Sequence, residues 1–357
     1  MIIGVPKEIR AQEERVALTP SAARTLVRAG HAVLIQQGAG HGSGLTDDEY
    51  IRAGSEIVPS AEDVWSRADL VWKVEDPLPA EMRLLRPGQV LFCFLHLPVR
   101  PDLSSRLVEQ GVYAFGMETF QTSDGTLPLQ RPLSEIAGHL AILEGSRCLQ
   151  VQQGGLGILL GGSTGVPAAR VVILGAGTVG RSAARAAIGL GAEVRALDVD
   201  LEALRWFDTF LPGRVHTLFA TPHAVEESLL AADLVVGAAL VPGHRSPRLV
   251  SRDQVGLLQP GAVLVDVAVD MGGCFETTVP GTLERPTRIV DGVVHHAVPN
   301  LCGAVPRTAT YALVHAALPV GLAIAARGSR GASEEPFLAS GLCVSEGEVR
   351  HAGARGT

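Results

Sequence analysis

The stretch VVILGAGTVGRSAARAAIGLGAEVRALDVD, residues 171–200, decides the fold of this chain. An apolar run enters the sequence GAGTVG (175–180), which matches the pattern G-x-G-x-x-G, and an alanine-rich helical segment and a second apolar run follow. Gly175 permits a tight turn, Gly177 lets the backbone approach a pyrophosphate, and Gly180 allows close packing of helix on strand. The N-terminus of the following helix faces the negative charge of the phosphates. The stretch therefore predicts a dinucleotide-binding turn.

Asp198 ends the second apolar run, 23 residues after Gly175, where a carboxylate accepts hydrogen bonds from an adenosine ribose. The same carboxylate would repel a 2′-phosphate, so NAD is favoured over NADP as the cofactor. A glycine-rich turn in an ordinary α/β protein would leave Asp198 unexplained. The cofactor contacts predicted from this stretch are Gly175, Gly177, Thr178, Val179, Gly180 and Asp198.

Outward from this stretch, short β-branched runs alternate with helical patterns rich in Ala and Leu, which predicts α/β architecture with parallel strands. A length of 357 residues favours two domains, each a mostly parallel sheet flanked by helices, the central one a Rossmann domain. The long helical patterns are 134–149 and the segment after Pro306, and the tail beyond Arg327 is polar and rich in glycine. The predicted strands are 2–5, 32–35, 70–74, 90–94, 112–115, 171–174, 193–197, 233–237 and 262–265, and the shorter helices are 21–29, 61–67 and 103–109.

Composition excludes several classes of protein. The net charge of −7 and the absence of a basic stripe argue against nucleic-acid binding. Five scattered cysteines without a CxxC pair fit a reducing cytoplasm better than a disulfide framework or a zinc site, and no metal is predicted. The start MIIGVPKEIR is not a signal peptide. The uncharged segment 308–326 has the length of a membrane span, but its polar residues, Pro319 and Gly321 favour a buried, kinked helix, so no membrane association is expected.

Several blocks resemble the alanine dehydrogenase family, which includes the α subunits of proton-pumping transhydrogenases. They are GVPKEIRAQEERVALTP, GHAVLIQQGAGHGSG, FLHLP, LPLQRPLSEIAGHLA, GAALVPGHRSPRLV, GAVLVDVAVDMGGCFETT and NLCGAVPRTATYAL. The resemblance covers about residues 1 to 345. It implies a discontinuous substrate domain, 1–128 plus 306–357, an inserted NAD-binding domain, 129–305, and a homo-hexamer.

The resemblance also implies residue roles. Arg15 would bind the substrate carboxylate, since a guanidinium suits bidentate carboxylate recognition. His96, in FLHLP, would be the acid/base for carbinolamine and imine formation, and Asp270 the second catalytic residue, beside the nicotinamide and the amino group. From the residues alone, Arg15 could be a surface arginine and His96 a core histidine. Further cofactor contacts implied by the family are Ser134, Leu240, Val267, Asn300 and Leu301.

The chain departs from the family around Lys73. The family pattern is K-V-K-E-P, whose second lysine helps to bind the substrate carboxylate, whereas this chain has Lys73-Val74-Glu75-Asp76-Pro77. A carboxylate there replaces attraction by repulsion. Lys73 and Glu75, two apart on a predicted strand, would project to the same face, so Lys73 could take over the role or pair with Glu75. Glu75 could also turn to solvent. On the cofactor side, Ala203, Ala220, Val279 and Cys302 also differ from the usual residues.

The resulting hypothesis is NAD-dependent oxidative deamination of L-alanine, or a related small amino acid, to its 2-oxo acid, with reductive amination in reverse. One alternative is an imine-reducing synthase that joins a 2-oxo acid to an amine-bearing substrate, in which Glu75 holds a cationic group. A non-enzymatic alternative is a transhydrogenase-like nucleotide-binding subunit, which we expect less because those chains lack the FLHLP histidine and continue into further segments.

Overall fold

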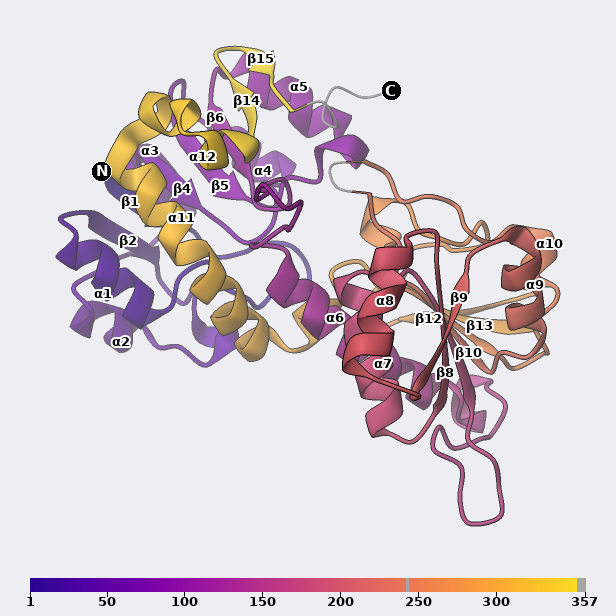
Figure 1. Cartoon of the computed structure of the whole chain (residues 1–357). Helices are drawn as coiled ribbons and strands as arrows, with labels where there is room; N and C mark the ends of the chain where they lie inside the picture. The colour runs from indigo at the N-terminus through magenta and orange to yellow at the C-terminus, as the bar shows by residue number, and fades with distance from the viewer. Residues whose placement is uncertain (242–243, 352–357) are drawn as a thin grey trace. The chain divides into compact units, whose positions relative to one another are not determined.

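The computed structural model describes residues 1–241 and 244–351, which form two compact units (Figure 1). Unit 1 contains residues 1–133, 244 and 303–351, and unit 2 contains residues 134–241 and 245–302. Both ends of the described chain therefore contribute to unit 1, and the glycine-rich turn belongs to unit 2.

Unit 1 is built on an eight-stranded sheet in the order β15-β14-β6-β5-β4-β1-β2-β3. Strands β1 to β6 run parallel, and β14 and β15 add an antiparallel edge. This edge comes from the polar tail beyond Arg327, which was not expected to form strands. The strands are β1 (Ile2–Val5), β2 (Ala32–Gln36), β3 (Glu56–Val58), β4 (Leu70–Trp72), β5 (Val90–Cys93), β6 (Tyr113–Gly116), β14 (Leu342–Ser345) and β15 (Glu348–Val349).

The helices of unit 1 begin at side-chain caps or prolines that the sequence supplies. Thr46 and Glu49 form a capping box at the start of α2, and Ser60 accepts a hydrogen bond from the backbone N–H of Asp63 at the start of α3. The helices are α1 (Pro20–Arg28), α2 (Asp47–Arg52), α3 (Ala61–Arg67), α4 (Pro79–Met82), α5 (Pro101–Glu109), α11 (Pro306–Glu334) and α12 (Pro336–Ser340).

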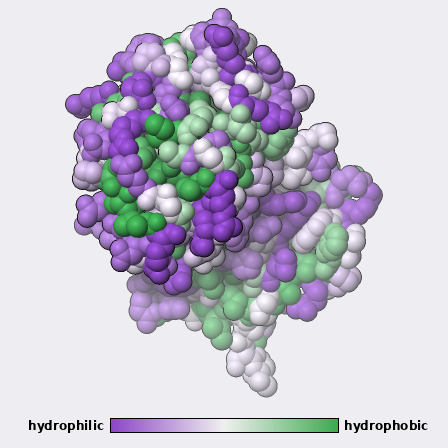
Figure 2. Space-filling model, turned by 90° about the vertical axis from the view of Figure 1, so that its left-hand side faces the viewer, coloured by the Kyte–Doolittle hydropathy of each residue, from purple (hydrophilic) through white to green (hydrophobic). Residues whose placement is uncertain are grey.

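Among the described residues, α11 is the one helix whose length and composition would suit a membrane span, but half of its most apolar window is buried in the protein. Gly321 in this helix faces Trp72 of β4, so α11 packs on the sheet as a core helix does. The helix runs through Pro319 with helical dihedral angles, and its interruption lies at Gly328 instead of the expected proline. The space-filling view in Figure 2 shows a mainly hydrophilic surface with a group of apolar residues on the face it presents.

Unit 2 contains a seven-stranded sheet in the order β12-β13-β11-β10-β7-β8-β9, parallel except for the edge strand β12. Alternate residues of β7 enter two different cores. Val171 and Ile173 pack with residues of α6, α7 and α8, and Val172 and Leu174 pack with residues of α9 and α10. The elements are α6 (Arg131–Cys148), β7 (Arg170–Leu174), α7 (Thr178–Gly189), β8 (Glu193–Asp198), α8 (Leu201–Phe210), β9 (Val215–Phe219), α9 (Pro222–Leu230), β10 (Leu234–Gly237), α10 (Arg252–Val255), β11 (Val263–Asp266), β12 (Thr287–Val290) and β13 (Val293–His296).

The parallel strands of each unit share one order. In chain order they run 3-2-1-4-5-6, which is the doubly wound Rossmann arrangement, with a reversal between β1 and β4 in unit 1 and between β7 and β10 in unit 2. Ligands of such sheets bind outside the carboxyl ends of the strands at the reversal. The predicted fold class is therefore confirmed for both sheets. The carboxyl edge of each sheet, at its reversal, is where a ligand is expected to bind.

We expect Gly321→Ala to lower the free energy of unfolding by about 1–3 kcal/mol, although alanine normally favours a helix. The added Cβ would lie 2.1 Å from Cη2 of Trp72, and both the helix and the ring are fixed by packing. Gly189→Ala, near the end of α7, is the control, because its Cβ would meet nothing within 4 Å. Urea denaturation of the two variants and the wild type measures the difference; equal stabilities would contradict this packing.

Candidate active site

In unit 1, residues from three distant segments meet at the strand reversal. Arg15 lies in the loop after β1, Glu75 follows β4, and His96 follows β5. Neighbouring parallel strands present their carboxyl ends at the same edge, which explains why these residues come together. One oxygen of Glu75 lies 2.6 Å from Nη2 of Arg15, and the other lies 3.5 Å from Nε2 of His96.

Arg15 is buried between two carboxylates. Its Nε and Nη2 donate to both oxygens of Glu13, at 2.8 and 2.6 Å, and Nη2 also donates to Glu75. Burial by itself would raise the pKa of Glu75, but the hydrogen bond with His96 and the charges of Arg15, His96 and Arg10 hold that pKa well below its usual range. The carboxylate of Glu75 is thus ionised and held. It is 6% exposed, so the alternative in which it turns to solvent is wrong.

The backbone around His96 is fixed by Glu118, a residue that no sequence pattern singled out. The N–H groups of Leu95 and His96 donate to the carboxylate of Glu118, at 3.1 and 2.8 Å, and His96 has a left-handed backbone (φ 50°). Burial raises the pKa of Glu118. The imidazole stacks on Phe94 at a centroid distance of 6.0 Å, with about a quarter of the side chain exposed. The available signal was a charged residue directly after the apolar run that forms β6.

A second ion-pair group adjoins Glu75. Asp76 accepts hydrogen bonds from Nη2 of Arg10, at 2.5 Å, and from Nη1 of Arg100. Asp76 is buried, whereas the side chains of Arg10 and Arg100 are 35% and 22% exposed. Ligand atoms of Glu75, Asp76 and His96 lie within 4.8 Å of one another, close enough for one metal ion. The guanidinium groups already supply the positive charge that these carboxylates need, so the arrangement is that of an ion-pair network.

Lys73 has a different environment from Glu75. Its side chain is fully buried, and Nζ donates to Glu8 at 2.9 Å and to Glu81 at 2.7 Å. The other oxygen of Glu8 accepts the backbone N–H of Val74. Strand β4 ends at Trp72, so the expected strand up to residue 74 is too long. The alternative in which Lys73 pairs with Glu75 is wrong, because each side chain has its own partners.

In unit 2, the glycine-rich turn has the geometry that its sequence predicts. Gly175 has a φ of 115°, and a Cβ there would lie 2.7 Å from the carbonyl oxygen of Ala238, at the end of β10. A Cβ at Gly180 would lie 1.9 Å from the carbonyl oxygen of Gly175, whereas one at Gly177 would meet nothing within 4 Å. Two glycines are needed for packing, and the middle one borders open space where a ligand can approach.

Asp198 closes this turn from the end of β8. Its Oδ2 accepts the backbone N–H of Ala176 at 2.6 Å, and its Oδ1 accepts that of Asp200 at 2.9 Å. The carboxylate is half-buried beside the turn. Its position at the carboxyl end of the second strand is the one expected for a ribose-binding acid.

The remaining predicted residues of unit 2 follow other strands at the same edge. The carboxylate of Asp270, after β11, accepts the backbone N–H of Asn300, after β13, at 2.9 and 3.1 Å. Ser134 lies at the start of α6, which approaches the start of α7: Ser182 donates to the carbonyl of Glu135 at 2.6 Å. Thr178 and Val179 begin α7, Leu240 follows β10, Val267 follows β11, and Leu301 is next to Asn300.

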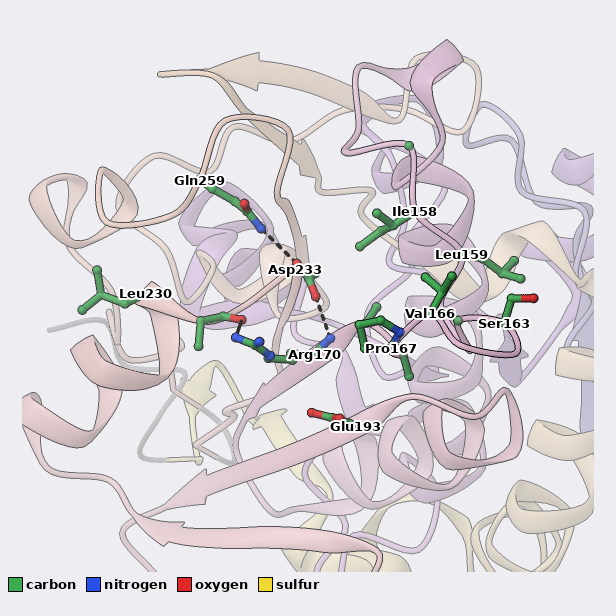
Figure 3. Close-up of a pocket in the computed structure, with 15 residues that line it drawn as sticks. Ile158, Leu159, Ser163, Val166, Pro167, Arg170, Glu193, Leu230, Asp233 and Gln259 are labelled. Atoms are coloured by element: carbon green, nitrogen blue, oxygen red, sulfur yellow. Dashed lines mark hydrogen bonds between the residues drawn. The ribbon is translucent and has the colours of Figure 1, made fainter.

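A cavity of about 550 Å³ in unit 2 lies away from this edge (Figure 3). It is lined by Arg170 and Glu193, which begin β7 and β8, and by Asp233, which precedes β10. Asp233 accepts hydrogen bonds from the backbone N–H of Arg170 and from Nε2 of Gln259. The cavity therefore opens at the amino ends of the strands, opposite to the predicted dinucleotide site.

Comparisons with known proteins place the chain in a family. Residues 4–137 match the family described as "Alanine dehydrogenase/PNT, N-terminal domain", and residues 141–352 match "Alanine dehydrogenase/PNT, C-terminal domain". The chain belongs to the alanine dehydrogenase/PNT family. It is 46% identical over 350 residues to the alanine dehydrogenase of Mycobacterium tuberculosis, covering 98% of this chain and 94% of that protein. The alanine dehydrogenase of Halomonas elongata is 45% identical over 352 residues, with 98% and 95% covered.

Solved structures agree with this assignment. A structure titled L-alanine dehydrogenase has a TM-score of 0.92 and 46% identity, covering 99% of this chain and 98% of that one. A transhydrogenase from Sinorhizobium meliloti has a TM-score of 0.80 and 26% identity, with 99% of both chains covered. The alanine dehydrogenase/PNT family comprises dinucleotide-binding oxidoreductases, and the resemblance stated from the sequence is confirmed.

Within this family fold, the buried Lys73 group predicts a pH-dependent stability. Burial is the largest influence on Glu8 and raises its pKa from 4.5 to about 7, against the opposing effect of Lys73. A carboxyl whose folded pKa lies above its unfolded pKa stabilises the protein below pH 4.5, and this contribution is lost as the pH rises to 7. Glu8→Gln should remove up to about 3 kcal/mol of this pH dependence.

Urea denaturation of the wild type and of Glu8→Gln at pH 5 and pH 8 measures this effect. Glu62→Gln, an exposed carboxyl in α3, is the control and should keep the wild-type pH dependence. An unchanged difference between the two pH values in Glu8→Gln would show that Glu8 is ionised throughout this range.

Proposed function

We propose that this member of the alanine dehydrogenase/PNT family catalyses NAD-dependent oxidative deamination of L-alanine, or of a related small amino acid, to its 2-oxo acid, and the reverse reductive amination. The observation that carries the proposal is the placement of His96 at the reversal of the unit 1 sheet, within an ion-pair network that contains Arg15. This edge joins an acid–base group to cations that suit a carboxylate substrate. Relatives of 46% and 45% identity named alanine dehydrogenase support the reaction class.

In the proposed mechanism, the residues of this chain bind the substrate and move protons. His96 takes a proton from the substrate amine, and during imine hydrolysis it transfers protons to and from the oxygen of the carbinolamine. The left-handed backbone of His96 and the hydrogen bond from its N–H to Glu118 fix the backbone that carries the imidazole, which lowers the entropic cost of this transfer. Asp270, held against the N–H of Asn300, stabilises the positive charge on the reacting nitrogen.

NAD fits the unit 2 edge by the donors and the space found there. Gly177 borders open space, the start of α7 offers backbone N–H groups to phosphates, and Asp198 offers a carboxylate to a ribose. When bound, the nicotinamide accepts or donates the hydride of the reaction. The predicted contacts Ser134, Thr178, Val179, Leu240, Val267, Asn300 and Leu301 form part of this proposal, as do the homo-hexamer and the cytoplasmic location.

The contacts of Arg15 favour a second candidate function, the imine-reducing synthase. Arg15 already contacts two carboxylates, which suits the imine-reducing synthase because Glu75 could hold an amine-bearing partner. NADH oxidation measured with a panel of 2-oxo acids, each with ammonia or with primary amines, separates the two functions. A dehydrogenase is fastest with ammonia, and a synthase is fastest with an amine.

NAD should be preferred strongly over NADP. The carboxylate of Asp198 would face the 2′-phosphate of NADP and repel it. Steady-state kcat/KM with each cofactor tests this, and Asp198→Ser should narrow the preference by roughly tenfold or more. An equal or higher kcat/KM of the wild type with NADP would exclude the ribose-binding role of Asp198.

His96→Ala and Asp270→Asn should each lower kcat by about 10²–10⁴-fold, the usual contribution of acid–base catalysis. Binding of NADH, followed by its fluorescence, should remain close to that of the wild type, because the glycine-rich turn is untouched. His139→Ala is a matched control, since His139 lies on α6 and contacts Ser182. A near-wild-type kcat in either of the first two variants would remove that residue from the mechanism.

A further inference from the structure

The carboxylate of Glu75 contacts Arg15 and His96, the two residues of unit 1 to which the proposed function assigns the substrate. One oxygen lies 2.6 Å from Nη2 of Arg15 and the other 3.5 Å from Nε2 of His96. A carboxylate that bridges an arginine and a histidine in this way has the charge and the contacts that a bound 2-oxo acid would have. Glu75 therefore competes with the carboxylate of any such substrate for Arg15.

The charges around Arg15 make this competition strong. Glu13 is fixed two residues away and takes the bidentate edge of the guanidinium, so Arg15 and Glu13 alone sum to zero. Glu75 brings the group of three to −1, and the further cationic groups near Glu75 are Arg10, which is paired with Asp76 and lies 4.0 Å away, and the imidazole of His96 at 3.5 Å. All three side chains of the group are at least 90% buried, so solvent screens these charges weakly. A second carboxylate brought to Arg15 would be repelled by the carboxylates of Glu13 and Glu75, and a cation brought to Glu75 would be attracted by its carboxylate.

The cations with exposed surface in this network are Arg10 and Arg100. Both hold Asp76, and their side chains are 35% and 22% exposed, whereas Arg15 is 1% exposed. Nε and Nη2 of Arg100 also hold the exposed Asp102, each at 3.0 Å, so Arg10 is the arginine of this pair whose guanidinium can take a further carboxylate. The network thus offers a carboxylate site at Arg10 and, next to it, an anionic site at Glu75.

We propose that Glu75 is a specificity-determining residue that disfavours substrates with a carboxylate as their only charged group, such as pyruvate, and favours a substrate with an additional cationic group. The class it selects is a basic amino acid and the corresponding 2-oxo acid, with the side-chain ammonium or guanidinium on Glu75. This inference rests on the proposed amino-acid dehydrogenase reaction and shifts its preferred substrate from a small amino acid to a basic one.

The test compares the wild type with Glu75→Gln, which keeps the size of the side chain and removes its charge, and with Glu75→Lys, which reverses the charge. Pyruvate binding to the NADH-loaded protein is measured by calorimetry, and kcat/KM for deamination is measured with L-alanine, L-ornithine and L-lysine. Glu62→Gln on the exposed surface of α3 controls for the change in net charge. Thermal unfolding of every variant is recorded, so that loss of folding is recognised.

Glu75→Gln and Glu75→Lys should tighten the Kd for pyruvate by roughly 10- to 100-fold, the value of one charge-assisted hydrogen bond. The preference for L-ornithine or L-lysine over L-alanine should fall by a similar factor in both variants, and Glu62→Gln should behave as the wild type. A wild type that binds pyruvate as tightly as Glu75→Gln does, or that prefers L-alanine over both basic amino acids, would overturn the proposal.

Failure of the dehydrogenase function and failure of the role of Glu75 give different experimental results. If the protein binds NADH but neither the wild type nor any variant reduces NAD with any of the amino acids, the proposed dehydrogenase function is wrong. The pyruvate Kd of the wild type and of Glu75→Gln still decides whether Glu75 competes for Arg15, because binding needs no turnover.

Discussion

The reversal of strand order within each parallel sheet is the constraint on which the rest of this protein depends. Where two neighbouring parallel strands send their connections to opposite faces of the sheet, the loops that leave them diverge and the carboxyl edge stays open. Unit 1 has this reversal between β1 and β4, and unit 2 has it between β7 and β10. Residues as far apart in sequence as Arg15 and Glu75 meet there, and the turn at Gly175 approaches the end of β10 for the same reason.

The carboxyl edge of such a sheet is formed by polar loops next to a buried core. Charged side chains in these loops are partly or fully buried and therefore need partners of opposite charge. In unit 1 Lys73 lies between Glu8 and Glu81, and Asp76 lies between Arg10 and Arg100. Buried ions cost several kcal/mol each when they are unpaired. Lys73 is thereby paired within unit 1, and its role in binding the substrate stays a prediction.

Local patterns explain what could be predicted from the sequence. The strand Ile2–Val5 and the helix Ala61–Arg67 have the bounds expected, and the turn at Gly175 has the expected geometry, because periodicity, caps and glycines act over a few residues. The three-residue strand β3 and the edge strands β14 and β15 were missed, since their sequences are short or polar and they form only by pairing with an existing sheet. The partners of Lys73 and Glu75 could not be predicted for a related reason. Glu8 lies 65 residues from Lys73, and Arg15 lies in a different loop from Glu75.

The charge at residue 75 decides the sum of the charges around Arg15. Glu13 neutralises Arg15 through a contact that spans two residues and is independent of the loop after β4. Asp76 is paired with Arg10 and Arg100, and Arg100 is also paired with Asp102, so the charges of these two arginines and two aspartates sum to zero. With these pairs fixed, a lysine at position 75 would give the group of Arg15, Glu13 and residue 75 a charge of +1, and glutamate gives −1. One position can thus reverse the sign of the charge beside Arg15, while the pair of Arg15 with Glu13 stays the same.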